Sequence, residues 1–259
     1  MKTRAEQLNA QLQRLTVPLP VFMVTGDEPL QHAESCDAIR AWLRQAGFTE
    51  REVMHVDAGF AWESLLESAN ALSLFADRKI IELRLGSQKL DKQASNLLQR
   101  YLDNPAPDNV LLIQADRLDA GAKKSAWFKQ VEQSGLVVEI WPIEPEQLPQ
   151  WMSQRASALG LNLSGDALQL LCSRIEGNLL AAKQELDKLN LLYPGHTIEA
   201  EQVIEAVADS SRYDIFALSD AVLMRDPARC QKILQVLRQE GVEATLVLWA
   251  LTREIRSLL

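Results

Sequence analysis

The residues best placed for chemistry lie in the turn after the first strongly apolar run of the chain. That run, Val21–Thr25, leads into TGDEPLQHAES, where Gly26 is followed by Asp27 and Glu28. A strand, a glycine turn and a helix form the setting of a phosphate-binding loop, but that loop needs a second glycine followed by Lys and Ser or Thr. Two carboxylates here would repel a triphosphate. The alternative is an ordinary strand-to-helix turn, whose acidic residues complement the N-terminus of a helix that begins near Pro29.

Other candidate catalytic and metal-binding residues are scattered along the chain. His32, His55 and His196 form no HExxH pattern, and the sequence contains no GxSxG motif. Asp116 and Asp119, near the fourth predicted strand, suit either a metal site or two solvated turn carboxylates. The third predicted strand does not end in the acidic pair that would hold magnesium and a water. We therefore expect no catalytic residue, no nucleotide-binding residue, no metal site and no cofactor.

A basic helix face with neighbouring aromatic residues is a candidate contact for nucleic acid. Lys123, Lys124 and Lys129 provide the charge, and Trp127 and Phe128 lie beside them. Such a face can contact phosphates. It can equally be a solvated surface above two aromatic side chains of the core, and the sequence leaves both interpretations open.

Leu74 and Phe75 indicate a site of a different kind. Before them, apolar residues recur at the i, i+3, i+4, i+7 spacing of one helix face, within a sector of about 120°; they are Trp62, Leu65, Leu66, Ala69 and Leu72. A continued helix would place the pair on the face that this pattern assigns to water, Leu74 with Glu63 and Glu67, Phe75 with Ser64 and Ser68. Either the helix ends near Ser73 and the pair joins the core, or two large apolar side chains are presented to a partner.

Composition and charge narrow the class of protein. The 259 residues are 47% hydrophobic and 24% charged, and the formal net charge of −8 argues against a generally DNA-coating surface without excluding a local basic groove. The three cysteines, Cys36, Cys172 and Cys230, are far apart and form no CxxC pair, which disfavours a disulfide framework or a zinc site. The polar N-terminus does not resemble a signal peptide, and no apolar run approaches a membrane span. These features predict a soluble, cytoplasmic protein.

The order of elements predicts two unlike parts. Up to about residue 143, short strands alternate with helices, which is typical of a parallel sheet covered on both faces. The predicted strands are Val21–Thr25, Glu52–Val56, Lys79–Leu85, Val110–Gln114 and Leu136–Trp141. The proline-rich run WPIEPEQLP then marks a domain junction.

After this junction every pattern is helical. The predicted helices are Leu148–Ala158, Asp166–Ile175, Leu179–Leu192, Ile198–Val207, Phe216–Met224, Ala228–Glu240 and Ala244–Leu259. The chain stops inside a helical pattern that carries much apolar surface. We expect the residues after about 210 to form only part of a domain.

Four strings in this order resemble the delta subunit of the bacterial DNA polymerase III clamp loader. They are ANALSLFADRKIIELRL, AWFKQVEQSGLVVEI, LPQWMSQRASALGLNLSGDALQLL and EGNLLAAKQELDKLNLLYPG. The resemblance implies an AAA+-like α/β domain at 1–143 without a functional P-loop, a small helical lid at 144–210, and the start of a helical collar domain at 211–259. It also implies that the protein does not bind ATP. In agreement, the lid string around Gly177 lacks the arginine by which ATP-binding relatives reach the nucleotide.

The resemblance assigns a task to the apolar pair. Delta subunits open the ring-shaped beta sliding clamp, and in this family a Leu-Phe pair at the end of a helix fills a hydrophobic pocket on the clamp. Those positions match Leu74 and Phe75, with Leu72 and Ser73 just before them. The family tends to carry glutamine at the place of Asn70 and methionine at that of Leu72, so a polar clamp contact from the shorter Asn70 is left open.

The resemblance further implies which molecules the protein meets. The expected partners are the beta sliding clamp, the gamma/tau and delta prime subunits of the loader, and primed DNA within the complex. The protein is then a component of the DNA polymerase III holoenzyme, a DNA-directed DNA polymerase, with no catalytic activity of its own. The alternatives are a nucleotide-driven AAA+ ATPase and a DNA-binding module.

Overall fold

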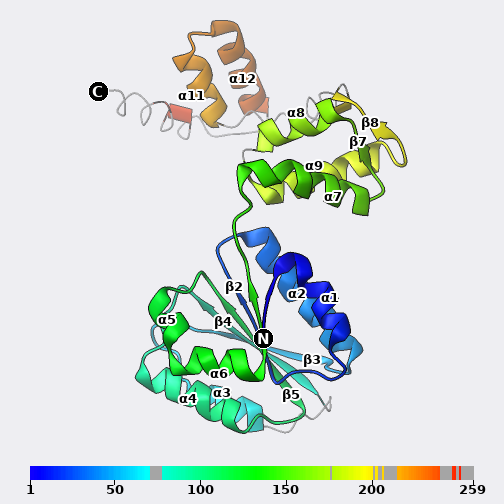
Figure 1. The fold of residues 1–259 in the computed structure, drawn as a ribbon. Helices are drawn as coiled ribbons and strands as arrows, with labels where there is room; N and C mark the ends of the chain where they lie inside the picture. Colours follow the sequence, from blue (N-terminus) through cyan, green and yellow to red (C-terminus); the bar gives the residue numbers. More distant parts are fainter. Residues whose placement is uncertain are drawn as a thin grey trace. The chain divides into compact units, whose positions relative to one another are not determined.

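The computed structural model describes residues 1–70, 78–175, 177–200, 202–203, 206, 215–239, 247–248 and 251. The chain divides into two compact units, Met1–Glu146 and Gln147–Leu259 (Figure 1). The first unit is an α/β domain and the second is mainly helical. Each unit is described by itself.

A six-stranded parallel sheet forms the centre of the first unit. Its strands lie in the order β1-β6-β2-β5-β4-β3, and every neighbouring pair is parallel. Their bounds are β1 Lys2–Arg4, β2 Val21–Thr25, β3 Glu50–His55, β4 Lys79–Gly86, β5 Asn109–Ala115 and β6 Leu136–Glu139. The parallel, helix-covered sheet confirms the predicted α/β fold class.

Helices cover both faces of this sheet, as Figure 1 shows. The helices on one face are α1 Leu8–Arg14 and α2 Pro29–Gln45, preceded by a 3-10 turn at Ala5–Gln7. The helices of the other face are α3 Glu63–Asn70, α4 Lys92–Asp103 and α6 Ala126–Ser134, with the short α5 Ala120–Lys124 before α6. Because both faces are covered, a strand such as β2 has all five of its residues buried.

Side chains of β2 alternate between two apolar cores. Val21 and Met23 pack under α3, α4 and α6, whereas Phe22 and Val24 pack under α1 and α2. Successive side chains of a strand point to opposite faces, so one unbroken apolar run supplies both cores. This is the reason that the parallel strands were recognisable as non-alternating runs.

One buried residue at the centre of β4, Glu82, is charged and not apolar. Glu82 is 0% exposed and accepts hydrogen bonds from Arg40 at 2.9 Å, from Arg51 at 2.6 and 2.9 Å, and from Gln114 at 3.0 Å. Burial opposes the charged form, but the bonds from Arg51 and Arg40 outweigh it and hold the pKa of Glu82 below its ordinary value. The paired charge ties β3, β4 and β5 to α2.

A 3-10 turn at Pro145–Gln147 spans the boundary between the two units, and the second unit follows it. It contains α7 Leu148–Ala158, α8 Gly165–Ile175, α9 Leu179–Leu192, α11 Ile215–Leu223 and α12 Pro227–Gln239. α8 packs against α7 and against α9, and a two-stranded parallel ladder joins β7 Asn162–Leu163 to β8 Thr197–Ile198. α11 and α12 pack through Leu218, Ala221, Ile233 and Leu237. In the described part of the chain, every helix is too short or too polar to cross a bilayer.

The structure corrects the predicted elements in a few places. Edge strand β1 was not predicted, because three residues carry too little periodicity to stand out. Ile198 lies in strand β8 and is buried, so the helix predicted at Ile198–Val207 does not begin there. Most of the helix predicted at Ala244–Leu259 falls outside the described residues. The division of the second unit into a lid and a collar stays a prediction.

Candidate functional site

The turn after β2, where a phosphate would bind in a nucleotide-binding relative, is packed against the chain itself. Gly26 has φ +146°, and a Cβ there would lie 2.4 Å from the Ile140 carbonyl oxygen. Its N–H donates to the Ala115 carbonyl at 3.2 Å, while Ile140 N–H donates to the Thr25 carbonyl at 2.8 Å. Gly26 therefore permits close contact between the turn and the segment after β6.

Both carboxylates of the turn are engaged by backbone amides. Glu28 is the N-cap of α2, and its carboxylate accepts from Leu30 N–H at 3.2 Å and from Gln31 N–H at 2.6 Å. Asp27 Oδ1 accepts from Arg117 N–H at 2.8 Å. A phosphate at a helix N-terminus uses those same unpaired amides. The acidic cap thus occupies the position that a phosphate would need. This agrees with the alternative of an ordinary strand-to-helix turn whose acidic residues complement the N-terminus of the helix.

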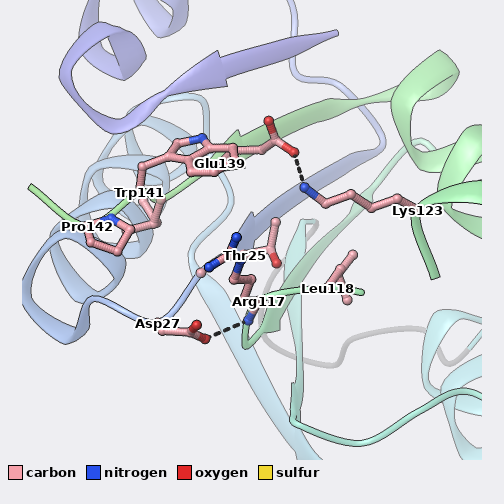
Figure 2. Close-up of a pocket in the computed structure, with 10 residues that line it drawn as sticks. Thr25, Asp27, Arg117, Leu118, Lys123, Glu139, Trp141 and Pro142 are labelled. Atoms are coloured by element: carbon pink, nitrogen blue, oxygen red, sulfur yellow. Dashed lines mark hydrogen bonds and ion pairs between the residues drawn. The ribbon is translucent and has the colours of Figure 1, made fainter. Parts of the chain in front are cut away.

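The space beside this turn is small. The cavity lined by Thr25, Asp27, Arg117, Glu139 and Trp141 measures about 10 Å³, which is room for about one water molecule. Figure 2 shows Lys123 bonded to Glu139, at 2.7 Å, and Asp27 bonded to the backbone of Arg117. A nucleotide does not fit into this cavity as it stands.

Trp141 also lines this cavity. The side chain is 45% exposed, and both the Arg117 guanidinium and the Lys123 ammonium lie 5.6 Å from its ring centre. Cations at this distance interact favourably with the face of an indole. The two cations therefore help to hold the segment after β6 against the turn.

The two aspartates considered as metal ligands have different surroundings. Asp119 is the N-cap of α5, accepting from Ala122 N–H at 2.7 Å, and pairs with Lys89 at 2.8 Å. The backbone of Asp116 accepts from the Thr25 hydroxyl at 2.7 Å. Across the described residues, His, Cys, Asp and Glu side chains nowhere gather in a group of three that could hold a metal ion.

The basic helix face lacks accessible aromatic rings. Trp127 is 4% exposed and Phe128 is 0% exposed, and both belong to the core beneath α6. Lys124 and Lys129 are exposed, while Lys123 is paired with Glu139. Trp127 and Phe128 are therefore core residues, as one of the two interpretations predicted. The three lysines do not share one helix, because Lys123 and Lys124 end α5 and Lys129 belongs to α6; phosphate contact by these lysines stays a prediction.

Leu72, Ser73, Leu74 and Phe75 lie outside the described residues, as does the rest of the segment 71–77. The described part of the preceding helix, α3, tests which of its residues face water. Glu63 and Glu67 are exposed, which agrees with the phase given for Leu74. Ser68, however, is only 9% exposed. Assigning Ser68 to water was therefore wrong, because its hydroxyl is buried through hydrogen bonds to Glu52 and Lys79 that the pattern does not reveal. The position of Phe75 stays a prediction.

The residues on either side of the segment 71–77 are held firmly. Lys79 Nζ donates to the Ser68 carbonyl at 2.7 Å, to Ser68 Oγ at 3.0 Å and to Glu52 Oε2 at 3.0 Å. Asn109 Nδ2 donates to the Ala69 carbonyl at 2.6 Å, and Arg78 donates to the Ala46 carbonyl at 3.0 Å.

This arrangement decides between two roles that the sequence allows for Lys79. Arg78 and Lys79 directly follow the apolar pair and could steer it toward an acidic rim on a partner, or Lys79 could simply be the first residue of a strand. Lys79 is only 5% exposed, and its ammonium is fully engaged within the domain. The sequence reveals Lys79 as the first residue of a strand, but not its distant partners.

Family models match both parts of the chain. Residues 22–141 match the model described as DNA polymerase III, delta subunit. Residues 144–205 match a model described as a middle domain.

Curated relatives extend the match over nearly the whole chain. The DNA polymerase III subunit delta of Haemophilus influenzae is 34% identical over 257 residues, which are 98% of this chain and 74% of that protein. The Escherichia coli protein of the same name is 33% identical, over 96% of this chain and 72% of that protein. Among solved structures, the DNA clamp loader delta protein of Bacillus subtilis has the same fold, with a TM-score of 0.67 at 17% identity, over 97% of this chain and 76% of that one. These matches confirm the resemblance noted in the sequence: the chain belongs to the family of DNA polymerase III delta subunits.

Proposed function

We propose that this protein is the clamp-loader subunit that binds the beta sliding clamp and opens its ring for loading on primed DNA. Its membership of the delta subunit family is the observation that carries the proposal. The turn at Gly26 supports a role without bound nucleotide, because Glu28 already occupies the amides at the start of α2. A nucleotide-driven ATPase would need those amides free.

We assign clamp binding to Leu74 and Phe75, with Leu72 and Ser73 beside them. The exposure of Glu63 and Glu67 on α3 supports an outward position for Leu74; for Phe75, the assignment rests on the family resemblance. Burying a Leu and a Phe in a partner's pocket contributes roughly 1.5–3 kcal/mol each. Central apolar anchors of this kind often dominate the energy of an interface.

Opening a ring by this means requires no bond chemistry. A subunit that binds the open form of the clamp more tightly than the closed form shifts the clamp toward the open form. The size of the shift is set by the difference between the two affinities. The protein then acts as a component of the DNA polymerase III holoenzyme, without catalytic activity of its own.

The same proposal includes the assembly. The gamma/tau and delta prime subunits are the expected neighbours in a cytoplasmic complex that holds primed DNA. Residues 1–143 form the clamp-binding domain, 144–210 the lid, and 211–259 part of a collar through which the subunits associate. A plain DNA-binding module is less well supported, because Trp127 and Phe128 are buried.

The test is the double substitution Leu74→Ala with Phe75→Ala, with affinity for the purified beta clamp and thermal melting measured on the same samples. We expect affinity to fall about a hundredfold, which corresponds to about 3 kcal/mol, with little change in melting temperature. The matched control is Leu65→Ala on the buried face of α3, where the side chain is 0% exposed. That change should cost about 2–5 kcal/mol of stability while leaving the clamp affinity of the folded protein unchanged. A double variant that melts as early as Leu65→Ala would place the pair in the core and overturn the assignment.

A further inference from the structure

We propose that the outer edge of strand β3 is a docking site for an extended, acidic segment of a protein partner, which adds to the six-stranded sheet as a further strand. The inference goes beyond the proposed function and does not depend on how the protein binds the clamp. Three observations carry it: an uncovered part of the sheet, a row of unpaired backbone groups, and an excess of arginine over carboxylate.

The helices on one face of the sheet leave β3 uncovered. In the described part of the chain, the core beneath α1 and α2 takes residues from β2, β4, β5 and β6, and none from β3. Met54 of β3 belongs to the core of the opposite face. The neighbours of Met54 in alternation, Arg51, Val53 and His55, therefore lie on the uncovered face, and all three are exposed. Parallel sheets are normally covered on both faces, so these three residues, the β3 strip, lack the cover that adjoining strands have.

The residues of the β3 strip also direct their backbone groups outward. Among the described residues, β3 is the last strand of the sheet and pairs with β4 alone. The N–H of Val56 donates to the Arg84 carbonyl of β4 at 2.9 Å. Because alternate residues of a strand bond to opposite sides, Arg51, Val53 and His55 direct their N–H and C=O groups away from β4. Such a row of unpaired groups is a template for another strand.

Arginine exceeds carboxylate around the β3 strip. Glu82, which is opposite Val53 in the register of β3 and β4, is fully buried. It pairs with the guanidiniums of Arg40, Arg51 and Arg84, and Arg40 also pairs with Asp37. These three cations and two carboxylates leave one positive charge in excess, on a chain whose formal net charge is −8.

Arg84 is the arginine least occupied by this cluster. Its Nη2 lies 3.5 Å from Glu82, at the limit of a hydrogen bond, whereas Arg40 and Arg51 approach Glu82 to 2.9 and 2.6 Å. In the described part of the chain, Arg84 Nε is buried without a hydrogen-bond partner. The side chain as a whole is 39% exposed. A guanidinium in this state can donate to a carboxylate that arrives from outside the domain.

The side chains at this edge indicate the pattern of the docking segment. Alternate residues of an added strand would lie beside Arg51, Val53 and His55. An acidic residue suits Arg51, an apolar one suits Val53, and a second acidic one suits the last position, because Arg84 is opposite His55 in the register. The intervening residues would lie on the face that carries Glu52, where an acidic side chain is unfavourable.

Two other occupants match the edge less well. A second copy of this chain, paired antiparallel about Val53, would place Arg51 opposite His55 and so bring no carboxylate to the β3 strip. The phosphates of a nucleic acid would suit the arginines, but they offer only acceptors. The edge presents carbonyl oxygens as well as N–H groups, and a peptide strand supplies partners for both.

The first experiment titrates a capped peptide, Thr-Glu-Thr-Val-Thr-Glu-Thr, into the full chain and follows backbone amides by NMR. We expect saturable shifts at the amides of Arg51, Val53 and His55, with slower hydrogen exchange there. The matched control, Thr-Glu-Glu-Val-Thr-Thr-Thr, has the same composition but directs its two acidic side chains to opposite faces. The control should bind about tenfold more weakly. Equal affinity of the two peptides, or shifts elsewhere alone, would refute the proposal.

Two variants test the backbone and the charge separately. Val53→Pro removes an outward N–H without breaking a bond to β4, because proline is tolerated at an edge where its nitrogen faces solvent. Arg84→Met removes the least occupied cation, while Arg40 and Arg51 keep Glu82 paired. Each variant should lose peptide affinity about tenfold. The control Arg100→Met removes an exposed cation from α4, on the opposite face, and should bind the peptide like the wild type.

The remaining outcomes identify a different occupant. If oligothymidylate displaces the peptide and its affinity falls in Arg84→Met but not in Val53→Pro, the edge binds phosphates and the proposal is wrong. A dimer in sedimentation equilibrium that Val53→Pro abolishes would assign the edge to a second copy and would equally refute it. If Val53→Pro does not fold, Arg84→Met and the pattern of amide shifts still decide. Both variants should keep the wild-type affinity for the beta clamp, so this proposal and the proposed function fail separately.

Discussion

Two connections at opposite ends of the same sheet use the ends of helices in opposite ways. After β2, at the carboxyl ends of the strands, the amides that begin α2 are bound by Glu28 from the same turn. Before β4, at the amino ends, the carbonyls of Ser68 and Ala69 on α3 are bound by Lys79 and Asn109 from the strands. In both places, backbone groups of a helix are thus bound by side chains of the same domain.

The difference lies in what each connection leaves for a partner. The turn at Gly26 borders a cavity of only about 10 Å³, and the carboxylates of Asp27 and Glu28 already accept backbone amides. The connection before β4 has fixed ends and carries Leu74 and Phe75 between them. The proposed function therefore places the contact with a protein partner at the amino ends of the strands and expects no ligand at the turn after β2.

The largest effect in this comparison is expected from Gly26→Ala. An added Cβ would meet the Ile140 carbonyl at 2.4 Å, on a backbone with φ +146°, so the turn and the segment after β6 must separate. We expect a loss of at least about 3 kcal/mol in the free energy of unfolding, measured by urea denaturation.

The control for this change is Gly86→Ala. Gly86 also has a positive φ, +54°, but a Cβ there meets nothing within 4 Å. Only backbone strain remains, which costs about 1–2 kcal/mol. Equal losses for the two variants would show that close packing of the turn against Ile140 is unimportant.

A smaller effect is expected from Glu28→Ala, which removes the N-cap of α2. Losing the bonds to Leu30 and Gln31 should lower the free energy of unfolding by about 1 kcal/mol, measured by urea denaturation. Glu28→Gln keeps an acceptor oxygen and should lose less.

The same proteins test whether the carboxylate alone keeps nucleotide away. Neither the wild type nor Glu28→Ala should bind ATP at micromolar concentrations in a calorimetric titration, because the second glycine and the lysine of a phosphate-binding loop are still missing. Saturable binding by the wild type would refute the role without nucleotide. Binding by the variant alone would show that Glu28 is the main barrier.

The smallest effect is expected in the stability of the protein at acidic pH, through Glu52 beside Lys79. Burial opposes the charged form of Glu52, but hydrogen bonds from Ser68 and Lys79 outweigh it and hold the pKa of Glu52 below its ordinary value of 4.5. Its stabilising contribution is therefore complete above the ordinary pKa and is lost as the pH falls through the lower folded value. Glu52→Gln should flatten the pH dependence of the unfolding free energy below about pH 4.5. An unchanged acid slope would show that Glu52 contributes little to holding α3, although Glu82 keeps part of that slope in both proteins.

Much of the fold was predictable because it depends on local patterns. The bounds of β2, α7 and α9 agree with those predicted, since unbroken apolar runs and helical periodicity are properties of neighbouring residues. The absence of a second glycine and a lysine after β2 is equally local. The strings that resemble the delta subunit family are also read directly from the chain, and the relatives confirm them.

What the sequence could not reveal are contacts between residues far apart in the chain. Edge strand β1 is defined by pairing with β6, more than 130 residues away. Lys79, Ser68 and Glu82 are polar, so a pattern that counts only polarity assigns them to water, whereas the structure buries each beside a distant partner.

By itself, therefore, the sequence determined the class of fold, the order of most elements, the family and the absence of a phosphate-binding motif. Only the tertiary structure decided that Glu28 occupies the amides at the start of α2 and that Lys79 and Asn109 bind the carbonyls of Ser68 and Ala69 on α3. The physical reason is that apolar burial follows from periodicity along one segment. Burial of a polar or charged group requires a matching donor or acceptor, and here the sheet brings that partner from a distant part of the chain.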